Sequence, residues 1–451
     1  MFEFRTISSH ALTVLVGQLA VMAFGVVDTV VSGRHSEAAL AALSVGSAIY
    51  ISVFVGLNGV LQALLPVWAE LHGARRHAGV GRSVRQSLYL WACTSAVGMV
   101  ALLFPQPVLE WTQVPASMRG EVQRYLAVLA AALPLNLLFR IYGTLNQALG
   151  KPALVTWLQA ASLMVKIPLS IWFAFGGFGL PALGVVGCAW ATLVVSALML
   201  ALALWLLASQ DIYRPYRIWH APEAPDWPTI RAYARLGVPG GLAILVEVSS
   251  FTLMALFIAR LGMVASASHQ IAASMAAVLY MLPLSLAIAT SSRASFWLGA
   301  GHPRRARAAI VTGLTLAIGA GAGQSGLVWF GRDLLANLYA AQPAVVALAA
   351  SLLAWVAVFH FFDAIQAMCV FVLRCFRVTV APLLVYCVLL WGVGLGGGYW
   401  LAYEGFAGRP PTQDPATFWI AGAGALALTA AIFLVFMARA VRRPPPAETT
   451  V

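Results

Sequence analysis

The sequence predicts an all-α integral membrane protein with twelve transmembrane helices. Hydrophobic residues make up 61% of the 451 residues, charged residues make up 9%, and the mean hydropathy is +0.87. Soluble proteins, by contrast, are about half apolar and a quarter charged. The apolar residues also form continuous runs of the roughly 20 residues that a helix needs to cross a bilayer. Strands of a membrane β-barrel would instead be about ten residues long with alternating polarity.

The predicted spans follow one another with short polar connections. Twelve stretches are long enough, at residues 11–32, 45–69, 87–109, 122–145, 155–180, 184–208, 232–259, 268–292, 308–330, 344–372, 378–402 and 416–438. The first is a full span with no small-residue cleavage site behind it, so we expect it to remain in the protein rather than act as a signal peptide.

The basic residues indicate how the chain is oriented. A formal net charge of +12 would also suit a nucleic-acid-binding protein, but the arginines and lysines follow the positive-inside rule. With the N-terminus in the cytoplasm, the larger set falls inside: Arg5, Arg75, Arg76, Arg82, Arg85, Lys151, Arg214, Arg217, Arg231, Arg235, Arg293, Arg304, Arg305, Arg307, Arg374, Arg377, Arg439, Arg442 and Arg443. A smaller set falls outside: Arg34, Arg119, Arg124, Arg260, Arg332 and Arg409. We therefore expect a bacterial inner (plasma) membrane protein with both termini cytoplasmic, and no nucleic-acid partner.

The two halves of the chain resemble each other at an offset of about 227 residues. Six spans in each half is an even number, so both halves enter the membrane in the same orientation. We expect two pseudo-symmetric six-helix bundles that face each other across a cleft. The predicted parts are an N-terminal lobe (1–208), a cytoplasmic inter-lobe linker (209–231), a C-terminal lobe (232–440) and a short cytoplasmic tail (441–451).

The sequence offers no catalytic or cofactor-binding motif. The GxSxG, HExxH and Walker motifs are absent, and the glycines of "GVGLGGGYW" (392–400) lie inside a predicted span with no strand before them. The five cysteines show no metal-ligand spacing, and we interpret them as packing residues. We expect no enzyme activity, no cofactor and no structural metal.

Three acids lie inside apolar runs, namely Asp28, Glu247 and Asp363. A carboxylate at the centre of a transmembrane helix costs about 2.5–3.5 kcal/mol on insertion scales, so it must face the protein interior or a water-filled cavity. There it can carry a proton or bind a cation such as Na+. The alternative for each acid is a neutral, hydrogen-bonded structural carboxyl group.

Two basic residues also lie within spans. Lys166 precedes Pro168 in an apolar helix, and Asp28 is the only acid well inside the same predicted bundle, so we expect Lys166 to be its counter-ion. The alternative is a lysine that reaches to the membrane interface. Arg140 lies near the inner end of its span, where it can reach the interface or pair locally.

Other polar and aromatic residues within spans are candidates for the cleft wall. Most such residues form hydrogen bonds between helices, while aromatic rings can stack on an organic cation. The candidate cleft or substrate contacts are Gln62, Asn136, Tyr280, Phe359 and Gln366.

Five stretches, taken in order, resemble the multidrug and toxic compound extrusion (MATE) transporters, and most closely their NorM-like branch. They are "GVVDTVVSG" (25–33), "GLPALGVVGCAWAT" (179–192), "GVPGGLAILVEVSSF" (237–251), "HQIAASMAAVLYMLPLSLAIATSSR" (269–293) and "FHFFDAIQ" (359–366). The resemblance implies a V-shaped pair of six-helix lobes that exports organic, often cationic, compounds in exchange for Na+ or H+. It also implies that Asp28 is the N-lobe acid, that Glu247 and Asp363 form a C-lobe cation site able to take Na+, and that Phe359 lies beside that site.

One segment departs from the family pattern. Relatives commonly read Asn-Ile-Pro-Leu-Asn-Tyr where this chain reads "KIPLSI" (166–171), so Lys166 and Ser170 replace two amides that help to build an N-lobe cation site. A fixed ammonium there would repel Na+. Our hypothesis is that N-lobe Na+ binding is lost, and that coupling runs through Glu247 and Asp363 or through protons exchanged between Asp28 and Lys166.

The expected function is cation-coupled antiport by alternating access, driven by a Na+ or H+ gradient. Expected partners are small organic cations and membrane lipid, and we expect a monomer. One alternative is a lipid-linked saccharide flippase of the same superfamily, which would need a basic cavity where this chain offers only Lys166 and Arg140. The other is a membrane-embedded transferase or hydrolase, which would need clustered catalytic polar residues.

Overall fold

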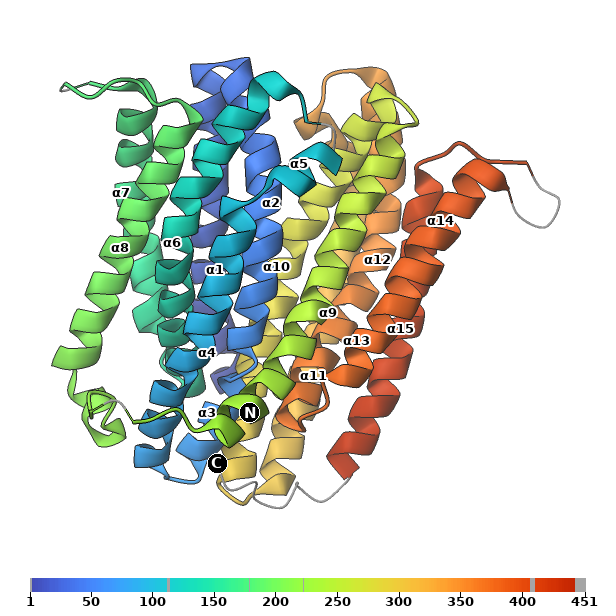
Figure 1. Cartoon of the computed structure of the whole chain (residues 1–451). Coiled ribbons are helices and arrows are strands. Elements are labelled where there is room, and N and C mark those ends of the chain that lie inside the picture. Colours follow the sequence, from blue (N-terminus) through green and yellow to red (C-terminus); the bar gives the residue numbers. More distant parts are fainter. Residues whose placement is uncertain (1, 112–113, 178, 222, 406–409, 443–451) are drawn as a thin grey trace. The chain divides into compact units, whose positions relative to one another are not determined.

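The computed structural model describes residues 2–111, 114–177, 179–221, 223–405 and 410–442. Within these ranges the regular elements are helices, apart from one isolated bridge between Gly177 and Leu180 (Figure 1). Among the described residues, twelve helical segments are long and apolar enough to cross a membrane, which confirms the predicted fold class. Two of the basic residues in the topology analysis, Arg409 and Arg443, and the tail from residue 443 onward lie outside the described residues.

The N-terminal unit comprises residues 13–241. Its central helix α6 packs against α2, α3, α4, α7 and α8, and the break between α2 and α3 lies within one long span. The elements are α1 (Phe2–His35), α2 (Glu37–Gln62), α3 (Leu65–Gly73), α4 (His77–Leu103), α5 (Gln106–Trp111), α6 (Ala116–Ala148), α7 (Pro152–Phe175), α8 (Val185–Ser209) and the short η1 (Asp211–Tyr216).

The C-terminal unit comprises the described residues from 242 to 442 together with residues 2–12. Its central helix α12 packs against α10, α11 and α15. The elements are α9 (Trp227–Ala259), α10 (Met263–Gly299), α11 (Pro303–Tyr339), α12 (Pro343–Cys375), α13 (Val380–Tyr386), the π-helix η2 (Cys387–Gly396), α14 (Gly397–Tyr399), the π-helix η3 (Trp400–Glu404) and α15 (Ala416–Arg442). The segments from α13 to η3 form a single span.

Local sequence signals mark several helix ends. Helices α7, α11 and α12 have a proline in the first turn, at Pro152, Pro303 and Pro343, where the missing N–H leaves no helix hydrogen bond unmade. Helix α2 begins after Ser36, whose hydroxyl accepts a hydrogen bond from the N–H of Ala39 at 3.0 Å. These signals separate successive spans.

The boundaries between the two compact units fall inside α1 and α9. The start of α1 belongs to the C-terminal unit, where Glu3 accepts hydrogen bonds from Arg293 Nε at 2.8 Å and from Trp297 Nε1 at 3.0 Å. Arg293 also stacks over the Trp297 ring at 4.6 Å. The N-terminal residues are therefore anchored to α10.

The start of α9 belongs to the N-terminal unit, where it packs closely on α2. A Cβ atom added at Gly237 would lie 2.5 Å from the carbonyl oxygen of Val60, and one at Gly241 would lie 2.5 Å from that of Gly56. Only glycine permits backbones to approach this closely.

The predicted inter-lobe linker is an ordered strap, which we define as the described residues of 210–226. It lies along α4 within the N-terminal unit. Arg85 donates to Glu223 at 2.5 Å and to the carbonyl oxygen of Arg217 at 2.6 Å, and the Gln86 side chain bonds to the backbone of Ala224 at 3.0 Å. The strap is therefore held on α4 by the side chains of Arg85 and Gln86.

Replacing Gly81 by alanine should destabilise the protein by about 1–3 kcal/mol, because over-packing forces the backbone to move. A Cβ atom at Gly81 would lie 1.8 Å from the carbonyl oxygen of Tyr216 in the strap. The matched control is Gly79→Ala on the same helix, where the nearest atom is 3.6 Å away and alanine should leave the stability unchanged or raise it. Thermal unfolding in detergent compares the two variants, and equal melting temperatures would contradict the packing of the strap.

The ion pair between Glu223 and Arg85 should make the strap sensitive to acid. The hydrogen bond from Arg85 lowers the pKa of Glu223 below its usual value of 4.5. A carboxyl group with a depressed folded-state pKa contributes stability that is complete above the unfolded pKa and is lost as pH falls through the folded pKa. We therefore expect the melting temperature to fall below about pH 4.5, and to fall less in Glu223→Gln. A pH series of thermal unfolding checks this, and an unchanged acid dependence in Glu223→Gln would count against it.

Candidate functional site

The structure places Asp28 and Lys166 side by side in the N-terminal unit. Asp28 lies on α1 and Lys166 on α7. These helices meet closely at Gly17, where an added Cβ atom would lie 2.3 Å from Oε1 of Gln159. The Thr156 hydroxyl donates to the carbonyl oxygen of residue 13 at 2.8 Å. Later residues of α1 contact later residues of α7, so the two helices run parallel. Asp28 and Lys166 therefore lie at the same height along them.

The two side chains form a buried ion pair. The ammonium Nζ of Lys166 lies 2.8 Å from Oδ1 and 3.0 Å from Oδ2 of Asp28. Lys166 is 0% exposed and Asp28 is 8% exposed. Lys166 therefore does not extend to the membrane interface, and each charge is neutralised by the other.

Residues of α7 and α8 complete the surroundings of this pair. Lys166 Nζ donates to the carbonyl oxygen of Cys188 at 3.1 Å and to Thr192 Oγ1 at 2.5 Å, while Ser170 donates to Asp28 at 3.3 Å. Sequence reasoning missed Thr192 and the Cys188 carbonyl. The only available signal was their spacing of four residues, which places both on one face of α8.

In the C-terminal unit the structure brings Glu247 and Asp363 to a common hydrogen-bond donor. The amide Nε2 of Gln366 lies 3.2 Å from Oε1 of Glu247 on α9 and 2.8 Å from Oδ1 of Asp363 on α12. Gln366 is 0% exposed, Asp363 is buried and Glu247 is partly buried. Two carboxylates that share one neutral donor repel each other unless a proton or another cation lies between them.

Two further residues, which no sequence motif marks, lie close to this acid cluster of Glu247, Gln366 and Asp363. The Tyr386 hydroxyl on α13 donates to Gln366 Oε1, which leaves the amide nitrogen facing the acids. Arg374, for which the basic-residue pattern predicts a position on the cytoplasmic side, is 2% exposed at the end of α12 and lies within electrostatic range of Glu247. Its guanidinium group stacks over the Phe371 ring at 4.6 Å. A tyrosine or arginine at a span end carries no distinctive pattern in the sequence.

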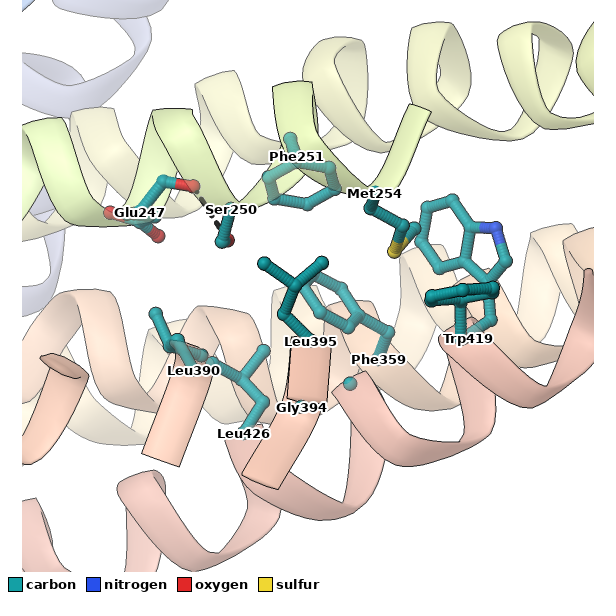
Figure 2. Close-up of a pocket in the computed structure, with 12 residues that line it drawn as sticks. Glu247, Ser250, Phe251, Met254, Phe359, Leu390, Gly394, Leu395, Trp419 and Leu426 are labelled. Carbon is teal, nitrogen blue, oxygen red and sulfur yellow. Dashed lines mark hydrogen bonds between the residues drawn. The ribbon is translucent and has the colours of Figure 1, made fainter. Parts of the chain in front are cut away.

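A pocket opens beside Glu247 (Figure 2). Figure 2 shows Glu247 at one end and Trp419 at the other, with Phe251 and Phe359 between them. The three rings contact one another at centroid distances of 5.6–6.1 Å. The wall is completed by Ser250, Met254, Leu390, Gly394, Leu395, Phe418, Gly422 and Leu426.

The size of this pocket limits what it can hold. Its cavity volume is about 30 Å³, enough for water or a small cation and far below the roughly 300–1,000 Å³ of drug-sized sites. In this conformation the pocket suits an ion beside Glu247 rather than an organic substrate.

The other predicted cleft residues fall into different settings. Asn136 connects three helices, because it donates to Tyr50 at 3.1 Å and accepts from Ser196 at 2.9 Å, and its amide is therefore engaged in helix packing. Gln62 is buried at the end of α2. Tyr280 on α10 is partly buried and lies within electrostatic range of the acid cluster. Phe359 lies in the pocket and Gln366 in the acid cluster, as described above.

Among the described residues no group of three or more His, Cys, Asp or Glu side chains is placed to hold a metal ion. Arg140 is partly buried within α6. The charged groups of the two units thus form two separate arrangements, a closed ion pair and an acid cluster beside a pocket.

Comparison with known proteins gives consistent matches over nearly the whole chain. The MatE family model matches residues 14–172 and 239–400. The chain is 39% identical over 440 residues to the "Probable multidrug resistance protein NorM" of Aromatoleum aromaticum, covering 98% of this chain and 95% of that protein. It is 33% identical over 442 residues to the "Multidrug resistance protein PmpM" of Pseudomonas aeruginosa, covering 98% and 92%.

Solved structures show the same fold. The crystal structure of the eukaryotic MATE transporter AtDTX14 superimposes with a TM-score of 0.86 at 19% identity, covering 98% of this chain and 97% of that one. Together with the twelve candidate spans, the bacterial relatives identify the chain as a multi-pass bacterial membrane protein.

Removing one partner of the Asp28–Lys166 pair should destabilise the protein by about 3–5 kcal/mol, because it leaves an unpaired buried charge. We expect this loss for Asp28→Asn and for Lys166→Met. The double variant should recover most of the lost stability, because replacing both members of a buried ion pair by uncharged groups often changes the free energy of unfolding little. Unfolding measurements on the four proteins form a double-mutant cycle, and additive losses in the double variant would show that the pair is not coupled.

Proposed function

The chain belongs to the MatE family of membrane transporters, which are not enzymes, and we propose that it is a cation-coupled antiporter that exports organic, often cationic, compounds. The names of the relatives, multidrug resistance proteins, support the type of cargo. The exchange of cargo for Na+ or H+, with no further cofactor, is our proposal from the buried acids.

The observation that carries this proposal is the acid cluster of Glu247, Gln366 and Asp363. Both carboxylates accept from one amide nitrogen, so their mutual repulsion is relieved when a proton or Na+ joins them. Carboxylate oxygens suit a hard cation as ligands. The pocket beside Glu247 gives a small cation room to reach the site.

The cycle that follows is alternating access. A cation or proton from outside loads the acid cluster, the protein rearranges, and substrate leaves outward; release of the cation inside then allows a new substrate to bind. Substrate and cation need not touch, because coupling requires only that each binds the two states with different affinity. Each tenfold change that one ligand causes in the affinity for the other corresponds to a coupling free energy of about 1.4 kcal/mol.

We place the protein in the bacterial inner membrane as a monomer with both termini in the cytoplasm. The basic residues support this orientation by the positive-inside rule. So does the even number of spans, because it brings both ends of the chain to one face of the membrane. Membrane lipid contacts the many exposed apolar side chains of the helices.

Transport should depend on Glu247. Reconstituted in proteoliposomes, the wild type should export a fluorescent organic cation under an imposed Na+ gradient or an imposed pH gradient. Glu247→Gln should reduce the rate at least about tenfold, since it removes a charge on which coupling depends. Glu404→Gln, which neutralises an exposed acid at the end of η3, is the matched control and should transport normally.

The same experiment can refute the proposal. If the folded wild type exports nothing under either gradient, drug antiport is wrong, and lipid-linked saccharide becomes the cargo to test. If Glu247→Gln transports at the wild-type rate, the acid cluster does not couple the ion.

A further inference from the structure

We propose that the ammonium group of Lys166 is a tethered cation that permanently fills an oxygen-lined site for a monovalent cation in the N-terminal unit. The intact unit then takes up no free cation. Shortening Lys166 should open the site to a small monovalent cation from solution, such as Na+, K+ or methylammonium.

Oxygen atoms surround the ammonium nitrogen Nζ of Lys166. Four oxygen atoms lie within 3.1 Å: Oδ1 and Oδ2 of Asp28 at 2.8 and 3.0 Å, the carbonyl oxygen of Cys188 at 3.1 Å, and Oγ1 of Thr192 at 2.5 Å. A carboxylate, a main-chain carbonyl and a hydroxyl are the oxygen ligands with which proteins bind hard cations. The ammonium group therefore occupies a position where a free ion could be coordinated.

Hydrogen bonds among the surrounding groups orient these oxygens toward the ammonium group. The Thr192 hydroxyl donates its hydrogen to the Cys188 carbonyl at 2.9 Å, so a lone pair of Oγ1 is free to face Lys166. Ser170 donates to Oδ1 of Asp28 at 3.3 Å, which orients the carboxylate from its other side. The shell offers acceptors and needs a positive charge at its centre.

The oxygen shell around Lys166 is largely buried. Lys166 and Cys188 are each 0% exposed, Asp28 is 8% exposed and Thr192 is partly buried. Helix α8 lies against α7 at Gly187, where an added Cβ atom would lie 2.4 Å from the carbonyl oxygen of Phe173. The oxygens are thus held by packed backbone as well as by the lysine, and the site should survive when the lysine is shortened.

Charge balance explains why the intact site takes no further ion. Asp28 and Lys166 together carry no net charge, so adding a cation would leave an uncompensated positive charge in a buried position. Removing a proton would leave an uncompensated negative charge for the same reason. This favours coupling through Glu247 and Asp363 over protons exchanged between Asp28 and Lys166, a consequence that rests on the proposed function.

The test measures cation-dependent stability in a background where Glu247→Gln and Asp363→Asn neutralise the C-terminal acids. Thermal unfolding is compared in NaCl, KCl and methylammonium chloride against choline chloride of equal ionic strength. With Lys166 present, the salts should give equal melting temperatures. With Lys166→Ala, at least one small cation should raise the melting temperature by about 2–5 °C over choline.

Two control variants separate cation binding from a general effect of the cavity. Lys166→Met removes the charge but keeps most of the volume, so no ion should fit. Lys166→Ala combined with Asp28→Asn keeps the cavity but removes the carboxylate, so no ion should be held. Neither variant should distinguish Na+ from choline.

Two results would overturn the proposal. One is a folded Lys166→Ala variant whose stability is the same in all four salts. The other is a Na+-specific rise in the melting temperature of the background protein with Lys166 intact, if that rise disappears on adding Asp28→Asn. Such a result would mean that a free ion binds at Asp28 beside the lysine.

If Lys166→Ala does not fold, binding of radioactive sodium to the proteins that retain Lys166 decides the question. If the Glu247→Gln, Asp363→Asn protein with Lys166 intact binds no sodium, the result supports the proposal. If that protein binds sodium and loses it on adding Asp28→Asn, the proposal is overturned. Both measurements report binding and stability without transport, so their outcome is independent of whether drug export succeeds.

Discussion

The structure depends on one constraint: a charge buried among the helices must be neutralised by a group in direct contact with it. Water is not available to solvate it, and transfer of an unpaired ion into a low-dielectric interior is costly. The N-terminal unit meets this constraint within itself, because Lys166 lies against both carboxylate oxygens of Asp28. That pair then requires α1, α7 and α8 to meet closely at one level.

The C-terminal unit meets the same constraint only in part. Glu247 and Asp363 share the amide nitrogen of Gln366, a neutral donor that orients the acids without cancelling their charge. Arg374 supplies positive charge within electrostatic range of Glu247, and the pocket leaves space beside that acid. One unit therefore pairs its buried charge within itself, while the other holds two acids beside a pocket, which is the arrangement that our proposal of cation binding requires.

The ion pair depends on helices that approach more closely than large side chains would allow. Gly17 and Gly187 bring α1 and α8 against α7. In lipid, helices associate through such packing and through polar contacts, because burial of apolar surface drives them together little. The spacing of small residues thus fixes which polar side chains meet.

The sequence by itself determined the twelve spans, the three acids within them and the unusual position of Lys166. These follow from hydropathy and charge along the chain, because the bilayer imposes a span length and a cost on each buried charge. Only the tertiary structure decided that Thr192 and the Cys188 carbonyl surround Lys166, that Gln366 joins Glu247 to Asp363, that Arg374 is buried, and that 210–226 is an ordered strap. The reason is physical: hydropathy records how each residue interacts with lipid and water, whereas partners from distant helices are set by how those helices pack.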